Sequence, residues 1–179
     1  MNFEVINIRR IDSTTGSFKL HEDYILSYDH SDGFSARLLS LGIYIDIIFE
    51  CKVEISFFLD GREGYEKQFE CEIPSQIKNT ILEILNLDSV LLKDYYADMF
   101  LEDETTQDYV INHSGKSHNI RIGTLLKKLQ PENPSEELFF VLIDLFKKWR
   151  EQIYQECLKE STTSNQINAN DKPNIRVKR

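Results

Sequence analysis

The sequence predicts one α+β domain in which an antiparallel sheet of about six or seven strands packs against two helices. Residues 43–59 place an apolar side chain at every odd position, the period-two pattern of a half-buried strand. Residues 74–86 and 134–160 instead repeat apolar side chains every three to four positions, which indicates helices. At 179 residues the chain is long enough to bury one continuous core.

The N-terminal part predicts short strands joined by turns. Residues 3–11 are expected to form a first strand that ends at the polar stretch 12–17. Residues 18–40 predict a hairpin, with alternating apolar positions in 18–28 and a return strand over 34–39. Its turn is expected at residues 30–33, because Asp32-Gly33 supports backbone with positive φ. Gly42 then marks a bend or a bulge.

Residues 43–73 predict the clearest hairpin. We expect one long strand to Leu59, a loop over residues 60–64 and a return strand from Tyr65, since both strands keep their apolar residues at odd positions. Pairing Leu59 with Tyr65 places Val53 opposite Cys71. It also places two like charges, Glu54 and Glu70, opposite each other.

The C-terminal half predicts a second hairpin between the two helices. Pro74 opens the first helix, and residues 88–104 fit either a short helix or a strand. Strands near 107–113 and 118–123 around the loop 114–117 would place His113 opposite His118. The last helix starts with Asn133 as N-cap and Pro134 at its first position, and Glu136 is placed to reach back to the cap.

Charge and composition limit the classes of partner. The net charge is −9, and the polar, basic-ended tail over residues 161–179, expected to be flexible, contributes +3, so residues 1–160 carry −12. A body this acidic repels a phosphate backbone, which argues against nucleic-acid binding by the folded part. No leader-like start or apolar run of about 20 residues is present, so we expect a cytoplasmic protein without membrane contact.

No cofactor or metal site is predicted from the motifs. Gly115-Lys116-Ser117 resembles the end of a phosphate-binding loop, but Val110 stands where the required upstream glycine belongs. The three cysteines, Cys51, Cys71 and Cys157, form no CxxC pair and are expected in the core. An acidic run lacks the spacing of a calcium loop; it consists of Asp98, Glu102, Asp103, Glu104 and Asp108.

The strongest functional hypothesis rests on acidic residues that share the non-core side of the 43–73 hairpin. We call them, together with one aromatic residue, the acidic face: Asp46, Glu50, Glu54, Phe58, Glu66, Glu70 and Glu72. They favour a non-enzymatic module that masks a basic protein partner. In size, charge and element order the chain resembles small acidic immunity proteins that neutralise bacterial toxins.

Two alternatives remain open at this level. One is a small enzyme with a site near His113, His118 and the acidic segment 98–108. The other is an adaptor or homo-oligomer that uses Trp149 and Tyr154 of the last helix as its interface.

Overall fold

The structure, a computed structural model, describes residues 4, 7–33, 37–58, 64–98 and 105–170, with only the backbone described over 163–170. It confirms the α+β fold, with a mostly antiparallel sheet of seven strands, a short helix and a long C-terminal helix. The strands are β1 Arg9–Ile11, β2 Phe18–Leu20, β3 Tyr24–Ser31, β4 Ser40–Asp46, β5 Cys51–Phe57, β6 Tyr65–Cys71, β7 Tyr95–Tyr96, β8 Thr106–His113 and β9 Lys116–Ile122, and the helices are α1 Ser75–Leu85 and α2 Pro134–Asn170.

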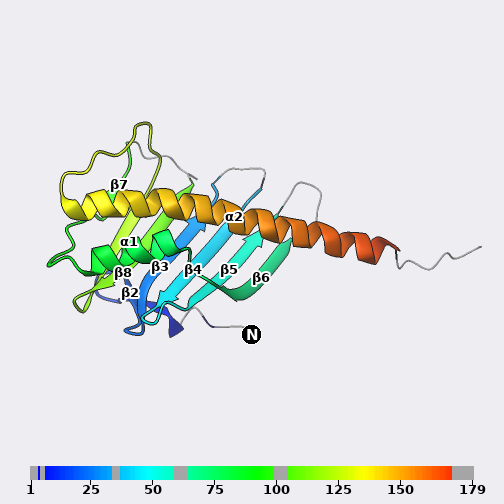
Figure 1. The fold of residues 1–179 in the computed structure, drawn as a ribbon, viewed down its shortest axis with the longest axis horizontal. Helices are drawn as coiled ribbons and strands as arrows, with labels where there is room; N and C mark the ends of the chain where they lie inside the picture. Colours follow the sequence, from blue (N-terminus) through cyan, green and yellow to red (C-terminus); the bar gives the residue numbers. More distant parts are fainter. Residues whose placement is uncertain (1–3, 5–6, 34–36, 59–63, 99–104, 171–179) are drawn as a thin grey trace, which may run out of the picture.

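The seven-stranded sheet has the order β6-β5-β4-β3-β8-β9-β7, and β1 pairs with β2 in a separate two-stranded ribbon. Both helices lie side by side across one face of the sheet (Figure 1). The ribbon packs on the opposite face, where it buries a small cluster of Ile8, Leu20, Tyr44 and Val110. The sheet is therefore covered on one face by helices and on the other only in part.

The main core lies between the sheet and the helices. The odd-numbered residues of β4 and β5 point into it, and Ile43, Ile45 and Val53 have no exposed surface. The helices supply Phe139, Leu142 and Phe146 from α2 and Ile77, Ile81 and Ile84 from α1. Within β4 and β5 the alternation thus predicted correctly which side chains face the core, whereas Ile47, an odd position in the turn between them, is 56% exposed.

The expected long strand over residues 43–59 is instead two strands, β4 and β5, joined by a tight turn. Asp46 closes this turn, because its Oδ1 atom accepts hydrogen bonds from the backbone N–H groups of Ile48 at 3.0 Å and Glu50 at 2.8 Å. Phe49 adopts a left-handed backbone with φ of 64°. Ile45 pairs with Cys51, so odd residues still face odd residues across the turn. For this reason the alternation of apolar residues continues across the turn and gives no sign of it.

The hairpins predicted over residues 43–73 and 107–123 both form with a register two residues away from the expected one. In β5–β6, Phe57 rather than Leu59 lies opposite Tyr65, and Cys51 lies opposite Cys71. In β8–β9 the loop is only Ser114-Gly115, and His113 pairs with Lys116 rather than His118. Ser114 and Gly115 both have positive φ, 49° and 77°, as a two-residue hairpin turn requires.

The N-terminal strands differ from the expected arrangement. Residues 18–28 divide into β2 and β3, which lie in different sheets. β3 pairs with β4 as its next strand in sequence, with Tyr28 opposite Ile43, so the return strand begins at Ser40 instead of residue 34. Within that expected strand, residues 34–36 lie outside the described residues and 37–39 are not strand. Gly42 lies within β4, opposite Asp29.

The two helices begin where the sequence places them. Pro74 precedes α1, and Asn86 follows its last residue. At α2, the Asn133 side chain accepts a hydrogen bond from the Glu136 N–H at 3.0 Å, while Glu136 bonds the Glu132 N–H at 2.7 Å. Residues 88–104, which by sequence fit either a helix or a strand, contain the short strand β7, which runs parallel to β9.

Helix α2 extends ten residues beyond the expected end at 160. Its 37 residues correspond to about 55 Å at 1.5 Å per residue. Figure 1 shows its C-terminal part passing over β6 and projecting past that edge of the sheet. The expected flexible tail, residues 161–179, therefore begins inside a helix, and residues 171–179 lie outside the described residues.

Candidate functional site

The sheet face opposite the helices has two halves. The β1–β2 ribbon lies over β3, β8 and β9, where Leu20 and Val110 are 3% and 1% exposed. On β5 and β6, the outward positions carry charged or polar side chains, and Glu66 and Glu70 are exposed. The uncovered half is the one on which the acidic face lies.

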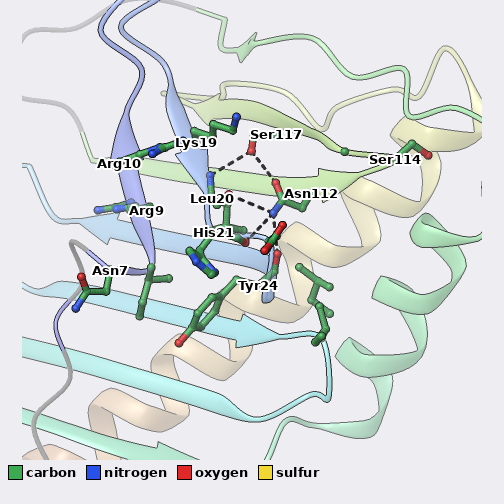
Figure 2. A pocket seen from close by; sticks show the side chains of 15 residues that line it. Asn7, Arg9, Arg10, Lys19, Leu20, His21, Tyr24, Asn112, Ser114 and Ser117 are labelled. Atoms are coloured by element: carbon green, nitrogen blue, oxygen red, sulfur yellow. Dashed lines mark hydrogen bonds between the residues drawn. The ribbon is translucent and has the colours of Figure 1, made fainter.

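Three side chains from β8 and β9 hold the ribbon in place through hydrogen bonds to backbone N–H and C=O groups of β2 and of the residues that follow it. The Asn119 amide accepts from the Phe18 N–H and donates to the Phe18 carbonyl, both at 2.8 Å. Ser117 Oγ accepts from the Leu20 N–H at 3.1 Å, and Asn112 donates to the carbonyls of His21 and Tyr24 (Figure 2). The ribbon is thus fixed by specific bonds as well as by its small apolar cluster.

A row of carboxylates crosses the sheet where the ribbon ends. On β3, Asp29 lies between Asp108 of β8 on one side and Gly42 of β4 on the other. Gly42 is in turn paired with Glu54 of β5. Each acid has a polar partner: Arg9 of the ribbon pairs with Asp29, and Arg121 forms two bonds with Asp108, at 2.6 and 3.1 Å. These ion pairs offset the repulsion between like-charged side chains on neighbouring strands.

Tyr44 joins the row to the acidic face. Its hydroxyl donates to Glu54 Oε1 at 2.7 Å and lies 3.4 Å from Asp29 Oδ1. Gly42 makes room for this contact, because a Cβ atom there would meet the Tyr44 hydroxyl at 2.6 Å and the Glu54 side chain at 2.9 Å. Burial raises the pKa of Asp29 to about 6, although Arg9 acts in the opposite direction. Asp29 is therefore a partly buried acid held under the ribbon.

The corrected register changes the electrostatics of the acidic face. Glu54 lies opposite Gln68 and not Glu70, and Glu70 lies opposite Lys52. The expected repulsion between Glu54 and Glu70 is therefore absent from the pairing. Lys52 also bonds the Tyr24 hydroxyl at 3.1 Å, which raises the pKa of the lysine.

The members of the acidic face divide into structural and exposed residues. Asp46 closes the β4–β5 turn, and Glu54 bonds Tyr44. Four acidic side chains are exposed to solvent: Glu50, Glu66, Glu70 and Glu72. Phe58 is 54% exposed at one end of β5, and Ile48 is 68% exposed beyond the other end. The exposed part is thus an acidic strip with an apolar residue at each end.

The residues of the expected enzyme site have separate structural roles. His113 is buried and its Nε2 donates to the Leu87 carbonyl at 2.9 Å, and its ring centre is 6.4 Å from that of His118. Asp98 Oδ2 accepts bonds from the N–H groups of Leu126 and Lys127. Among the described residues no three His, Cys, Asp or Glu side chains gather as metal ligands. Glu102, Asp103 and Glu104 lie outside the described residues.

The two residues of the helix-interface hypothesis lie in the core of this chain. Trp149 is 6% exposed and packs edge-on against Phe146. Tyr154 is 5% exposed and contacts the Phe57 ring, with the Arg37 guanidinium 4.8 Å from its ring centre. Both side chains therefore point away from the exposed side of α2, where a partner would bind.

A buried charge network under α2 had no signal in the sequence. His30 lies between Arg150 Nη1 and Asp32 Oδ1, each at 2.9 Å. Arg37 bonds Asp32 at 2.7 Å and Glu151 at 3.0 Å, so the network joins the sheet to the helix. His30 and Arg150 are 120 residues apart in the chain, and only the fold brings them together.

The pocket drawn in Figure 2 is an open hollow of about 800 Å³ between the ribbon and the β8–β9 turn. Asn112 and Ser117 line it, and both bond Leu20 of β2. The side chains of Arg10, Lys19 and His21 are solvent-exposed. The hollow thus results from the way the ribbon is attached.

Comparison with known protein families finds no matching family model, and comparison with curated proteins finds no relative. In the part of the chain that the structure describes, no helix is long and apolar enough to cross a membrane.

Proposed function

We propose that this protein is a non-enzymatic binding module that masks a basic protein partner with its acidic face. An immunity-type inhibitor of a basic toxin is the form of this function that its size, charge and element order favour. The observation that carries the proposal is the uncovered outer surface of β5 and β6, where Glu66 and Glu70 project into solvent beside Glu72.

The charge of this surface favours a cationic ligand. The outward residues of β5 and β6 are Lys52, Glu54, Ser56, Glu66, Gln68 and Glu70. Lys52, the one cation among them, bonds Tyr24 and lies opposite Glu70. A basic surface placed here would gain attraction to the glutamates and would be steered toward them by the acidic body.

The apolar residues at the two ends of β5 supply contact area of the kind that strengthens an interface. Phe58 packs against Gly64, where a Cβ atom would lie 2.5 Å from its ring, and more than half of its surface is exposed. Ile48 is exposed in the β4–β5 turn. Binding energy in interfaces concentrates on such large side chains, while surrounding charges set specificity and association rate.

The test is affinity capture from a lysate of the source organism with three immobilised proteins: wild type, Glu66→Lys/Glu72→Lys and a control. Glu66 and Glu72 are chosen because both are exposed, whereas Glu54 bonds Tyr44 and Glu70 faces Lys52. Glu83→Lys/Asp144→Lys is the matched control, with the same change in charge at exposed helix positions.

The expected result is a protein rich in Lys and Arg that is recovered with wild type and the control but not with Glu66→Lys/Glu72→Lys. Circular dichroism and thermal unfolding must show that all three proteins are folded. Recovery of the same partner with the acidic-face variant would contradict the proposal. The proposal is also contradicted if no captured protein is bound by the control and lost with Glu66→Lys/Glu72→Lys.

A further inference from the structure

Cys51 on β5 and Cys71 on β6 lie directly opposite each other on the helix side of the sheet. Their sulfur atoms are 3.8 Å apart. Paired residues of antiparallel strands have Cα atoms roughly 4.5–5.5 Å apart, which falls within the range of disulfide-linked residues. Since a disulfide bond is about 2.05 Å long, the two sulfur atoms need to approach by about 1.8 Å. Side-chain rotation can supply a movement of this size.

We propose that Cys51 and Cys71 form a reversible redox site, a cross-strand dithiol that closes to a disulfide by exchange with a small-molecule disulfide. The site lies on the opposite side of the sheet from the acidic face, and the inference does not depend on the proposed function. It reassigns two residues that the sequence places simply in the core.

The two cysteines differ in the way that an exchange reaction requires. Cys71 is half-buried near the end of the edge strand, whereas Cys51 is 2% exposed. The hydrogen bond between the two sulfur atoms lowers the pKa of Cys71, although burial acts to raise it. The same hydrogen bond, followed by burial, raises the pKa of Cys51. Cys71 is therefore the attacking thiolate, because exchange proceeds through the thiolate of an accessible cysteine.

The reaction has two balanced steps. The Cys71 thiolate attacks one sulfur of the small disulfide, which breaks that S–S bond and releases one thiolate. Cys51 then loses its proton to solvent base and attacks the Cys71 sulfur, which forms the cross-strand bond and releases the second thiolate. Overall, the two protein thiols are oxidised by two electrons and the small disulfide is reduced to two thiols.

Cys157 is the internal control of this site. It is buried on α2 and lies beside Tyr65, with which it shares a hydrogen bond. Tyr65 is at the other end of β6 from Cys71, six residues away, or about 20 Å along a strand. The fold therefore brings together one pair of the three cysteines.

The consequence of closure is local. β6 is an edge strand, and among the described strands it pairs with β5 alone. A covalent bond at the Cys51–Cys71 end of this pair would restrict the opening of β6 from the sheet, as edge elements open more readily than central ones. Amide hydrogens of Phe69 and Glu70 should then exchange more slowly in the oxidised protein.

The experiment equilibrates the full chain in mixtures of reduced and oxidised glutathione, traps free thiols with an alkylating agent, and maps linked peptides by mass spectrometry. Wild type and Cys157→Ser should both form a Cys51–Cys71 disulfide and lose two hydrogen atoms. Cys51→Ser should stop at a glutathione adduct on Cys71. The effective concentration of the native pair should exceed that of the same chain in urea by at least about tenfold, because the fold holds the sulfur atoms together.

Three results would overturn the proposal. The first is that Cys51 and Cys71 of the native protein remain free thiols in every glutathione mixture, whether the starting protein is reduced or oxidised. The second is a linkage that involves Cys157. The third is an effective concentration no greater in the native protein than in urea, since proximity in the fold is the basis of the inference.

Discussion

His30 lies between two charged groups, Arg150 of α2 and Asp32 after β3, and its side chain is fully buried. A guanidinium has only N–H donors, so His30 Nδ1 must accept from Arg150 and carries no proton. Nε2 then holds the single ring proton and donates it to Asp32. Burial and then the Arg150 charge lower the pKa of His30 to about 4. The imidazole is therefore neutral where a free histidine would begin to protonate.

This network predicts a pH dependence of stability. The pKa of His30 is lower in the folded than in the unfolded chain, so the unfolded chain binds the proton first as the pH falls. The stabilisation is complete above about pH 6.5 and is lost as the pH falls toward 4, by about 2–3 kcal/mol in the free energy of unfolding.

The comparison protein for this prediction is His30→Gln, whose amide can still bond both Arg150 and Asp32. Subtracting its unfolding free energy from that of wild type between pH 4 and 7 removes the contributions of other groups, including Asp29. A difference that stays constant across this range would show that His30 does not titrate as described.

Tyr28 and Tyr109 face each other across β3 and β8 and offer a matched pair of hydroxyl deletions. Tyr28 bonds Gln107 and Arg150 at 3.4 and 3.5 Å, whereas the buried Tyr109 hydroxyl has no partner among the described residues. Tyr109→Phe should leave stability unchanged or raise it by up to about 1 kcal/mol, and Tyr28→Phe should lower it by about 0.5–1.5 kcal/mol. Urea unfolding of both variants checks the order, and the reverse order would refute the assignment.

At the scale of elements, the ribbon β1–β2 is the part of the fold whose attachment depends on few side chains. Asn119→Ala removes both bonds to Phe18 while leaving the β8–β9 pairing intact. We expect a loss of about 1–3 kcal/mol in stability and faster hydrogen exchange at the Phe18 and Leu20 amides, because two backbone groups lose their partners. Asn79→Ala, at an exposed position of α1, is the control. Unchanged exchange at Phe18 would contradict this account.

The elements also show what the sequence could and could not predict. Alternation assigned Val53, Ile55 and Phe57 to the core correctly, since burial of one face imposes a period of two. It could not select among registers that differ by two residues, because all of them keep the same faces buried. Both hairpins therefore have the expected faces and a different register.

The geometry of the loops sets the hairpin register, which the alternation of apolar residues does not determine. The β4–β5 turn depends on Asp46 as a backbone acceptor and on a left-handed Phe49. Aspartate is a common turn residue and phenylalanine is not, and the unbroken apolar alternation around Asp46 outweighed that one signal. The helix starts, in contrast, carry local signals, and the cap at Asn133 forms as expected. The exposed glutamates of the site were predicted, but Arg9, Asp29 and Tyr44 were not, since strands far apart in sequence bring them together.

At the scale of the whole molecule, the two sheet faces have different tasks in this account. The helix face holds the core and the buried network that joins α2 to β3. The outer face is divided between the attached ribbon and the acidic face on β5 and β6. Because residues 1–160 carry −12, the proposed attraction to a basic partner would act over the whole body and would be strongest where carboxylates are uncovered.

Isothermal titration with the purified partner measures whether the acidic face carries the binding. Wild type, Glu66→Lys/Glu72→Lys and Glu83→Lys/Asp144→Lys are titrated at the same ionic strength. We expect the acidic-face variant to raise the Kd by at least about 30-fold and the control by less than about threefold, because only the first places like charges at the interface. Equal weakening by both variants would show that net charge, and not the acidic face, determines binding, and would contradict the account.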